Sequence, residues 1–303
     1  MAPVADFGGC PIRKTSKVGE MSLTSARIGE FFHDEHRLEY TEYGNGDRWV
    51  VLMHGQLMPR RMHDPLARAL AEAGNHVITL DLLGHGESDR PADPTLYSMM
   101  DFGRQVIDLL DAVGADRAVI GGTSLGANVS LEVADQYPER VEGLICEMPV
   151  LDNAVEAGLI AFAPLMFVAR FTPLLVTGVR VLSSLVPRRF VGFWTGIALD
   201  TMKQYPQPMG AAVHGIFFGR IAPSSRLRRQ ITAPALVIGH PRDPVHPAAD
   251  AAMLATELPN ATFVRADSIL EWRRHPERLT GETIAFVERC YSQPSDIRRV
   301  RST

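Results

Sequence analysis

The chain has 303 residues, 46% of them hydrophobic, which predicts one large α/β domain with an insertion or two smaller domains. Its net charge of −4 provides no basic surface for nucleic acid. The three cysteines, Cys10, Cys146 and Cys290, have neither the spacing of a metal site nor that of a disulfide framework. We therefore expect no nucleic-acid partner, no metal and no cofactor.

The two ends of the chain have the composition of flexible segments. Residues 1–26 contain glycine, proline and mixed charges without an apolar stretch, which predicts a flexible arm and no secretion signal. Residues 292–303 predict a disordered basic tail. With no signal in the sequence, we expect a cytoplasmic protein.

Apolar strands alternate with amphipathic helices in the first half of the chain. An antiparallel hairpin is expected over residues 27–43. Further strands are expected at 49–53, 76–80, before Ser124 and at 141–146, and helices at 65–73, 99–113 and up to 137. This alternation predicts a doubly wound, mostly parallel sheet, which binds ligands at the carboxyl ends of its strands.

The alternation stops at residue 152 and resumes at residue 226. Residues 152–225 are apolar segments broken by prolines, which predict an inserted helical cap. The pattern then continues with strands at 235–239 and 261–265 and helices at 248–258 and 277–291. The predicted core domain therefore consists of residues 27–151 and 226–291.

The cap is unusually apolar between residues 155 and 186. Arginine and proline interrupt this stretch, so it contains no continuous apolar span of about 20 residues and predicts no transmembrane helix. The surplus of apolar side chains indicates an apolar pocket or a surface that meets lipid or another subunit. A homodimer formed through the cap is one expectation.

The strand before Ser124 leads into the sequence Gly122-Thr123-Ser124-Leu125-Gly126, which fits the G-x-S-x-G nucleophile elbow. Such a turn holds its serine in a strained conformation, and small residues on either side let the strand and helix approach. The start of the next helix offers N–H groups to an oxyanion. The alternative is an ordinary turn in which the serine caps the helix.

Together with this elbow, three further segments resemble the α/β-hydrolase family, over residues 27 to 291. They are His54-Gly55-Gln56, the D-x-x-G-x-G-x-S loop of residues 81–91, and Asp243-Pro244-Val245. The resemblance implies an α/β-hydrolase fold with a cap and Ser124 as nucleophile. It also implies Asp243 as the acid, and the backbone N–H groups of Gln56 and Leu125 as the oxyanion hole.

The base is harder to assign. In the family a histidine precedes, by about seven residues, the proline that opens the last helix. In this chain Pro276 corresponds to that proline. The residue seven positions before it, where the family has its histidine, is Ile269. His275 lies in the same loop and is our candidate base, because a loop can be rerouted; its alternative is a surface position. Glu271 could act as a base only if burial raised its pKa.

The remaining histidines and a second carboxylate have simpler interpretations. His246 shares the turn of Asp243 and is expected only to pack there, whereas His54 and His85 are expected to orient loops through backbone atoms. Glu147 follows a strand at the Ser124 edge. It could replace Asp243, but we prefer a buried residue paired with an arginine.

These residues predict a serine hydrolase that cleaves an ester, thioester or lactone of an apolar small molecule. The alternative is a non-hydrolytic relative with an incomplete triad, such as a ligand-binding module, cyclase or lyase. A third possibility is a structural protein whose cap binds another chain.

Overall fold

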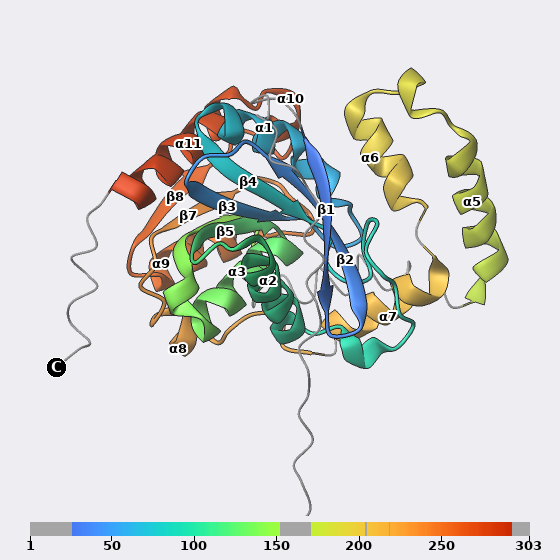
Figure 1. Ribbon diagram of the computed structural model, residues 1–303, viewed down its shortest axis with the longest axis horizontal. Coiled ribbons are helices and arrows are strands. Elements are labelled where there is room, and N and C mark those ends of the chain that lie inside the picture. The colour runs from blue at the N-terminus through green and yellow to red at the C-terminus, as the bar shows by residue number, and fades with distance from the viewer. Residues whose placement is uncertain (1–25, 152–170, 204, 218, 293–303) are drawn as a thin grey trace, which may run out of the picture.

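A computed structural model of the chain describes residues 26–151, 171–203, 205–217 and 219–292 (Figure 1). The predicted N-terminal arm up to residue 25, the tail from residue 293 and residues 152–170 of the predicted cap lie outside this part of the chain. The division into a core and a cap domain stays a prediction.

An eight-stranded sheet forms the centre of the fold, in the order β1-β2-β4-β3-β5-β6-β7-β8. β1 and β2 form the expected antiparallel hairpin, β2 is also antiparallel to β4, and all other neighbours are parallel. The predicted doubly wound, mostly parallel sheet is thus confirmed. The strands are β1 (Arg27–His33), β2 (His36–Tyr43), β3 (Arg48–Met53), β4 (Asn75–Leu80), β5 (Ala118–Thr123), β6 (Val141–Glu147), β7 (Ala235–Gly239) and β8 (Ala261–Arg265).

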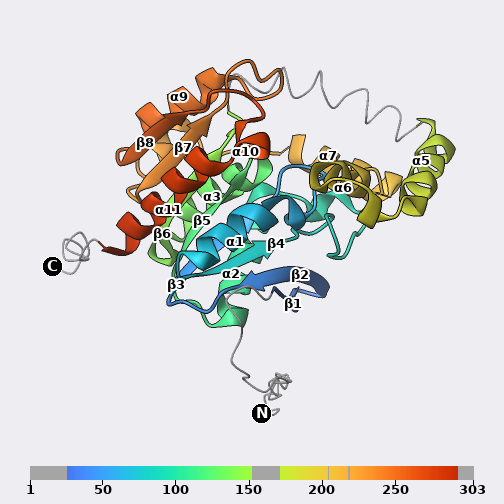
Figure 2. The ribbon, with the colours of Figure 1, turned by 90° about the horizontal axis from the view of Figure 1, so that it is seen from above.

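Helices cover both faces of this sheet (Figure 2). α2 (Met99–Val113), α3 (Leu125–Gln136) and α9 (Ala248–Glu257) pack on one face, and α1 (Asp64–Glu72) and α11 (Glu277–Ser292) pack on the other. Successive side chains of a strand point to opposite faces, so Val51 and Ile120 join one core and Val50 and Val119 the other. Burial on both faces explains why these strands are continuous apolar runs.

In the described residues between β6 and β7 there are four α-helices: α5 (Pro173–Leu185), α6 (Phe193–Thr201), α7 (Pro206–Phe217) and α8 (Ser225–Arg228). An ion pair and a hydrogen bond join α6 to residues outside the predicted cap. The Arg61 guanidinium lies 3.0 Å from Asp200, and the indole N–H of Trp194 donates to the Arg273 carbonyl over 2.8 Å. In the described part of the chain, no helix is long and apolar enough to cross a membrane.

The short elements escaped prediction. η1 (Arg60–His63) follows the His54 loop, and α10 (Glu271–Arg274) lies between β8 and α11, where only a loop was expected. A four-residue helix makes about one turn, so it leaves no periodic pattern in the sequence.

Candidate active site

The turn after β5 has the geometry of a nucleophile elbow. Ser124 adopts φ 55° and ψ −107°, a conformation that residues other than glycine rarely occupy. A Cβ atom at Gly122 or Gly126 would lie only 2.1 or 2.3 Å from the Met53 carbonyl oxygen of β3. The two glycines therefore allow β3, β5 and α3 to meet at this point, and the predicted strained turn is confirmed.

The side-chain partner of Ser124 is His246, which lies in the loop between β7 and α9. Ser124 Oγ and His246 Nε2 are 2.9 Å apart, and His246 Nδ1 lies 2.9 Å from Asp243 Oδ2. In the neutral tautomer that fits these contacts, Nδ1–H donates to the carboxylate and Nε2 accepts from the serine hydroxyl. A hydroxyl, an imidazole and a carboxylate in this order can move the hydroxyl proton onto the ring.

The Asp243 carboxylate also builds the turn that carries His246. Its Oδ1 accepts the backbone N–H groups of Val245 and His246 at 2.8 and 2.9 Å. Burial alone would raise the pKa of Asp243, but the hydrogen bonds from the His246 ring and the two N–H groups outweigh it and lower the pKa. The carboxylate thus stays charged beside the imidazole.

His275, our candidate base, is not brought to Ser124. It is exposed at the end of α10, where its backbone N–H bonds to the Glu271 carbonyl oxygen. Ile269, at the position where the family pattern has its histidine, is 37% exposed. The available signal was the spacing of His246, three residues after Asp243 and within reach across one turn. From the sequence alone, we expected His246 to share the turn of Asp243 and only to pack there.

Glu271 does not have the raised pKa that a carboxylate base needs. Burial would raise it, but hydrogen bonds from Arg278 and from the Asp267 N–H lower the pKa of Glu271. A carboxylate held in the charged form by a guanidinium is a weak proton acceptor.

The expected oxyanion groups lie on two sides of the elbow. Leu125 is the first residue of α3, so its N–H has no partner inside the helix. The His54-Gly55-Gln56 segment passes close by, since a Cβ atom at Gly55 would lie 3.9 Å from Ser124 Cβ. Both polar atoms of the Gln56 side-chain amide are buried and have no hydrogen-bond partner among the described residues. Such atoms are rare in folded proteins and mark places where a ligand or water can bind.

Glu147, the second carboxylate of this edge, is the last residue of β6 and is 2% exposed. The Arg273 guanidinium and the Thr123 hydroxyl donate to its carboxylate, and His240 Nε2 lies 3.1 Å away. Burial alone would raise the pKa of Glu147, but Arg273 and His240 lower it well below its usual range. Glu147 thus has the arginine partner that we preferred, and it supports the elbow through the Ser124 N–H, which donates to its carbonyl oxygen over 2.8 Å.

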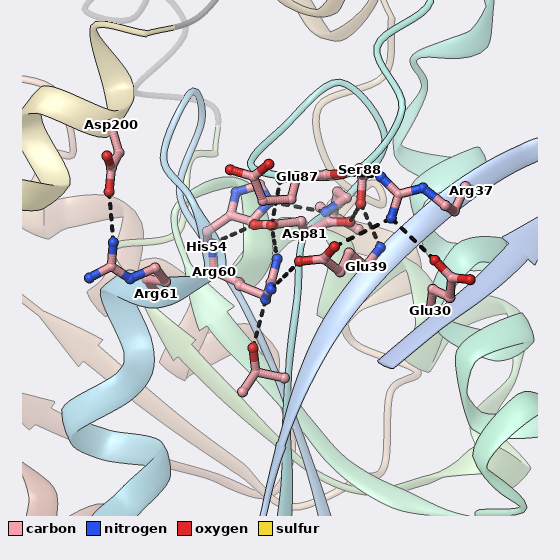
Figure 3. A network of polar contacts seen from close by, with 12 residues as sticks. Glu30, Arg37, Glu39, His54, Arg60, Arg61, Asp81, Glu87, Ser88 and Asp200 are labelled. Carbon is pink, nitrogen blue, oxygen red and sulfur yellow. Dashed lines mark hydrogen bonds and ion pairs between the residues drawn. The ribbon is translucent and has the colours of Figure 1, made fainter. Parts of the chain in front are cut away.

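A buried network of charged side chains fixes the loops beside the site (Figure 3). Arg60 is 4% exposed, and its guanidinium binds Asp81, Glu39 and the Thr41 hydroxyl. The Asp81 carboxylate also accepts the Glu87 N–H over 2.9 Å. The loops after β3 and β4 are therefore joined by compensated charges in the protein interior.

Two buried histidines orient the same loops, as predicted. His54 Nδ1 lies 2.9 Å from the Gly55 carbonyl oxygen, and its Nε2 accepts the Leu82 N–H over 3.1 Å. His85 Nδ1 lies 3.0 Å from the Leu83 carbonyl oxygen. Burial lowers the pKa of both histidines to about 3, so both are neutral near pH 7.

A cavity of about 340 Å³ lies next to the Glu147–Arg273 pair. Its walls are mostly apolar and come from α1, α6 and the α10–α11 segment, with Leu66, Trp194 and Trp272 among the lining residues. Ser124 does not line this cavity, but Glu147 links the cavity to the elbow.

Comparison with known proteins agrees with this architecture. The family pattern described as "alpha/beta hydrolase fold" matches residues 48–268. A haloalkane dehalogenase of Mycolicibacterium paratuberculosis is 28% identical over 154 residues, 50% of this chain and 51% of that protein. The chain spans about half the length or less of the first curated relatives that it matches.

Solved structures agree over most of the chain. An enol-lactonase from Burkholderia xenovorans LB400 has a TM-score of 0.69 at 20% identity, over 86% of this chain and all of that one. A thermophilic esterase from Thermogutta terrifontis has a TM-score of 0.68 at 22% identity, over 88% of this chain and all of that one. At these identities the likeness concerns the fold alone. The family pattern shows that this chain belongs to the α/β-hydrolase fold family.

Proposed function

We propose that the protein is a serine hydrolase that cleaves an ester, thioester or lactone of an apolar small molecule. Ser124 is the nucleophile, His246 the base, Asp243 the acid, and the Leu125 and Gln56 N–H groups form the oxyanion hole. The observation that supports this most is the continuous contact from Ser124 Oγ through the His246 ring to Asp243, with 2.9 Å at each step. Family membership and an esterase and a lactonase among the structures of similar fold agree with this reaction class.

The reaction follows from the positions of these groups. Ser124 Oγ attacks the substrate carbonyl carbon while His246 Nε2 takes the hydroxyl proton, and Asp243 stabilises the imidazolium that results. The carbonyl oxygen becomes an oxyanion held by the backbone donors. We propose that the Gln56 amide, whose buried polar atoms have no partner among the described residues, adds a third hydrogen bond. The imidazolium then protonates the leaving group. Water, activated by the same ring, releases the acyl group from Ser124.

The non-hydrolytic alternative depended on the missing histidine at position 269. His246 supplies an imidazole from another loop, so this reason for the alternative loses its force. The hydrolytic function is therefore our first choice.

The decisive experiment compares two histidine variants. A serine hydroxyl needs a proton acceptor to react near neutral pH, so His246→Ala should lower turnover of a p-nitrophenyl ester by about a thousandfold or more. His275→Ala is the matched control and should change turnover by less than about twofold, since its side chain is exposed and lies in another loop. Turnover is measured by release of p-nitrophenolate.

The nucleophile is tested separately in the same preparations. A fluorophosphonate probe should label the protein, and Ser124→Ala should abolish the labelling. If His275→Ala but not His246→Ala removes activity, the assignment of the base is overturned. If neither the wild type nor any variant reacts with the probe or with esters, the hydrolytic function is overturned.

A further inference from the structure

Helix α5 exposes an apolar surface of unusual size. Leu174, Leu175, Leu182 and Leu185 are 87%, 60%, 67% and 72% exposed. A helix that is apolar on almost every side is normally buried in a protein core or in a membrane. Contiguous apolar surface of this kind on a folded protein marks an interaction site.

On an ordinary surface helix the apolar side chains face the core and the polar ones face solvent, whereas on α5 the leucines are exposed. The residues least exposed on α5 are Val176, Arg180 and Ser183, which recur at the spacing of one helix face. Arg180 on this face lies over the Tyr205 ring, 4.3 Å from its centre. The leucines therefore point away from the molecule. In Figures 1 and 2, α5 is the outermost element on this side, and α6 lies between it and the sheet domain.

The charge around this surface has one sign. Between Ala157 and Leu199 the sequence contains four arginines and no aspartate or glutamate, although the whole chain has a net charge of −4. Two of these arginines, Arg188 and Arg189, lie in the short turn after α5, where Arg189 is exposed next to Phe190, which is 72% exposed. Leucines, an exposed phenylalanine and arginines without acidic neighbours are the composition of a segment that binds anionic lipid surfaces.

We propose that α5 and the Arg188–Phe190 turn dock on a membrane surface that contains anionic lipid. The leucines of α5 enter the boundary between head groups and acyl chains, and the arginines contact lipid phosphates. The 13 residues of α5 are too few to span a bilayer, which needs about 20, so the helix lies in the interface. A second copy of the chain fits this surface less well, because it would offer the same surface, with arginines and no acidic side chain between residues 157 and 199 to pair with them. The proposal does not depend on the chemistry at Ser124.

Vesicle flotation tests the proposal with the full chain. We expect the protein to float with vesicles of equal parts phosphatidylglycerol and phosphatidylcholine, and to bind them less as salt is added. Vesicles of phosphatidylcholine alone should bind at least about tenfold more weakly. The double variant Leu174→Glu/Leu182→Glu should lower the partition coefficient by about tenfold or more, and Arg188→Gln/Arg189→Gln should remove most of the preference for anionic lipid.

The matched control is Ile28→Glu/Phe32→Glu on β1, where the replaced side chains are 67% and 63% exposed. It should bind vesicles like the wild type, and circular dichroism should show that all variants are folded. Equal binding by the α5 variant and the control would overturn the proposal. So would a wild-type dimer in light scattering that the α5 variant converts to a monomer while neither protein binds vesicles. That result would assign the surface to a second copy of the chain.

Discussion

At the scale of single residues, the edge of the sheet beside Ser124 contains two carboxylates with different partners. Asp243 contacts the His246 ring, whereas Glu147 is paired with Arg273 and lies under the elbow. Both are held in the charged form, but their partners differ: Asp243 binds the imidazole that we propose as the base, and Glu147 neutralises a guanidinium in the interior. Their variants should therefore fail in different ways.

Asp243→Asn should lower turnover by about a thousandfold or more, because an amide cannot stabilise the imidazolium and favours the wrong tautomer. Glu147→Gln should instead leave the buried Arg273 without its counter-charge and lower the free energy of unfolding by about 3 kcal/mol. Its turnover per folded molecule should fall by less than about tenfold. Ester turnover and urea unfolding of both variants measure the two effects, and the reverse ranking in turnover would move the acid to Glu147.

Local sequence patterns predicted the candidate nucleophile and acid, but they could not predict which histidine contacts Ser124. Ser124 and Asp243 were found because each lies in a local pattern, the elbow and the turn after a strand. His246 lies in the same turn as Asp243, but whether its ring points to Ser124 depends on how β5 and β7 are spaced across β6, which no local pattern encodes. The Gln56 backbone N–H was expected at the oxyanion hole from the resemblance, whereas the burial of the Gln56 side-chain amide follows from tertiary packing.

At the scale of elements, the long strands and helices were predicted well because their periodicity extends over several turns or pleats. α2 begins and ends at the predicted residues: Ser98 caps its start, and Gly114 with φ 75° ends it. α10 was missed because four residues carry no period. The outward face of α5 could not be predicted either, because an apolar helix is equally compatible with an apolar pocket.

The close approach of β3 and α3 at the elbow requires a residue without a side chain at position 126. Gly126→Ala places a methyl group 2.3 Å from the Met53 carbonyl oxygen, which is backbone and cannot move away alone. We expect the free energy of unfolding to fall by about 1–3 kcal/mol and ester turnover to fall with it.

Gly281→Ala in α11 is the control, since a Cβ atom there meets nothing within 4 Å. It should leave turnover unchanged and stabilise the helix by up to about 1 kcal/mol. Thermal unfolding and ester turnover of both alanine variants measure these effects. Equal stability of the two variants would show that the elbow has room for a side chain.

At the scale of the whole molecule, three buried neutral histidines make stability depend on pH. Burial lowers the pKa of His54 and His85 to about 3 and that of His63 to about 4. In the unfolded chain a histidine takes up a proton near pH 6.5, so below that pH the unfolded state binds more protons. Stability is therefore complete above about pH 6.5 and is lost as the pH falls toward the folded values.

Each of these histidines should contribute about 1.4 kcal/mol of lost stability per pH unit between about pH 6 and pH 4. His63→Gln should reduce this slope by the contribution of one histidine, because glutamine does not titrate. The glutamine amide can still donate toward the Met53 carbonyl oxygen, which lies 2.9 Å from His63 Nε2. Urea unfolding at several pH values measures the slope. An unchanged slope in the variant would show that His63 does not contribute.

The Asp243–His246 turn has a consequence for the tolerance of the fold to change. The proposed acid and base lie on one short segment, so the proposed site depends on the alignment of two backbone segments, that turn and the Ser124 elbow. The stretch between β8 and α11 carries neither proposed group, and it is tied to the site through Arg273, which pairs with Glu147 under the elbow. Insertions there that keep the Arg273–Glu147 pair should leave the site intact, which makes this stretch a place where the fold can acquire new sequence.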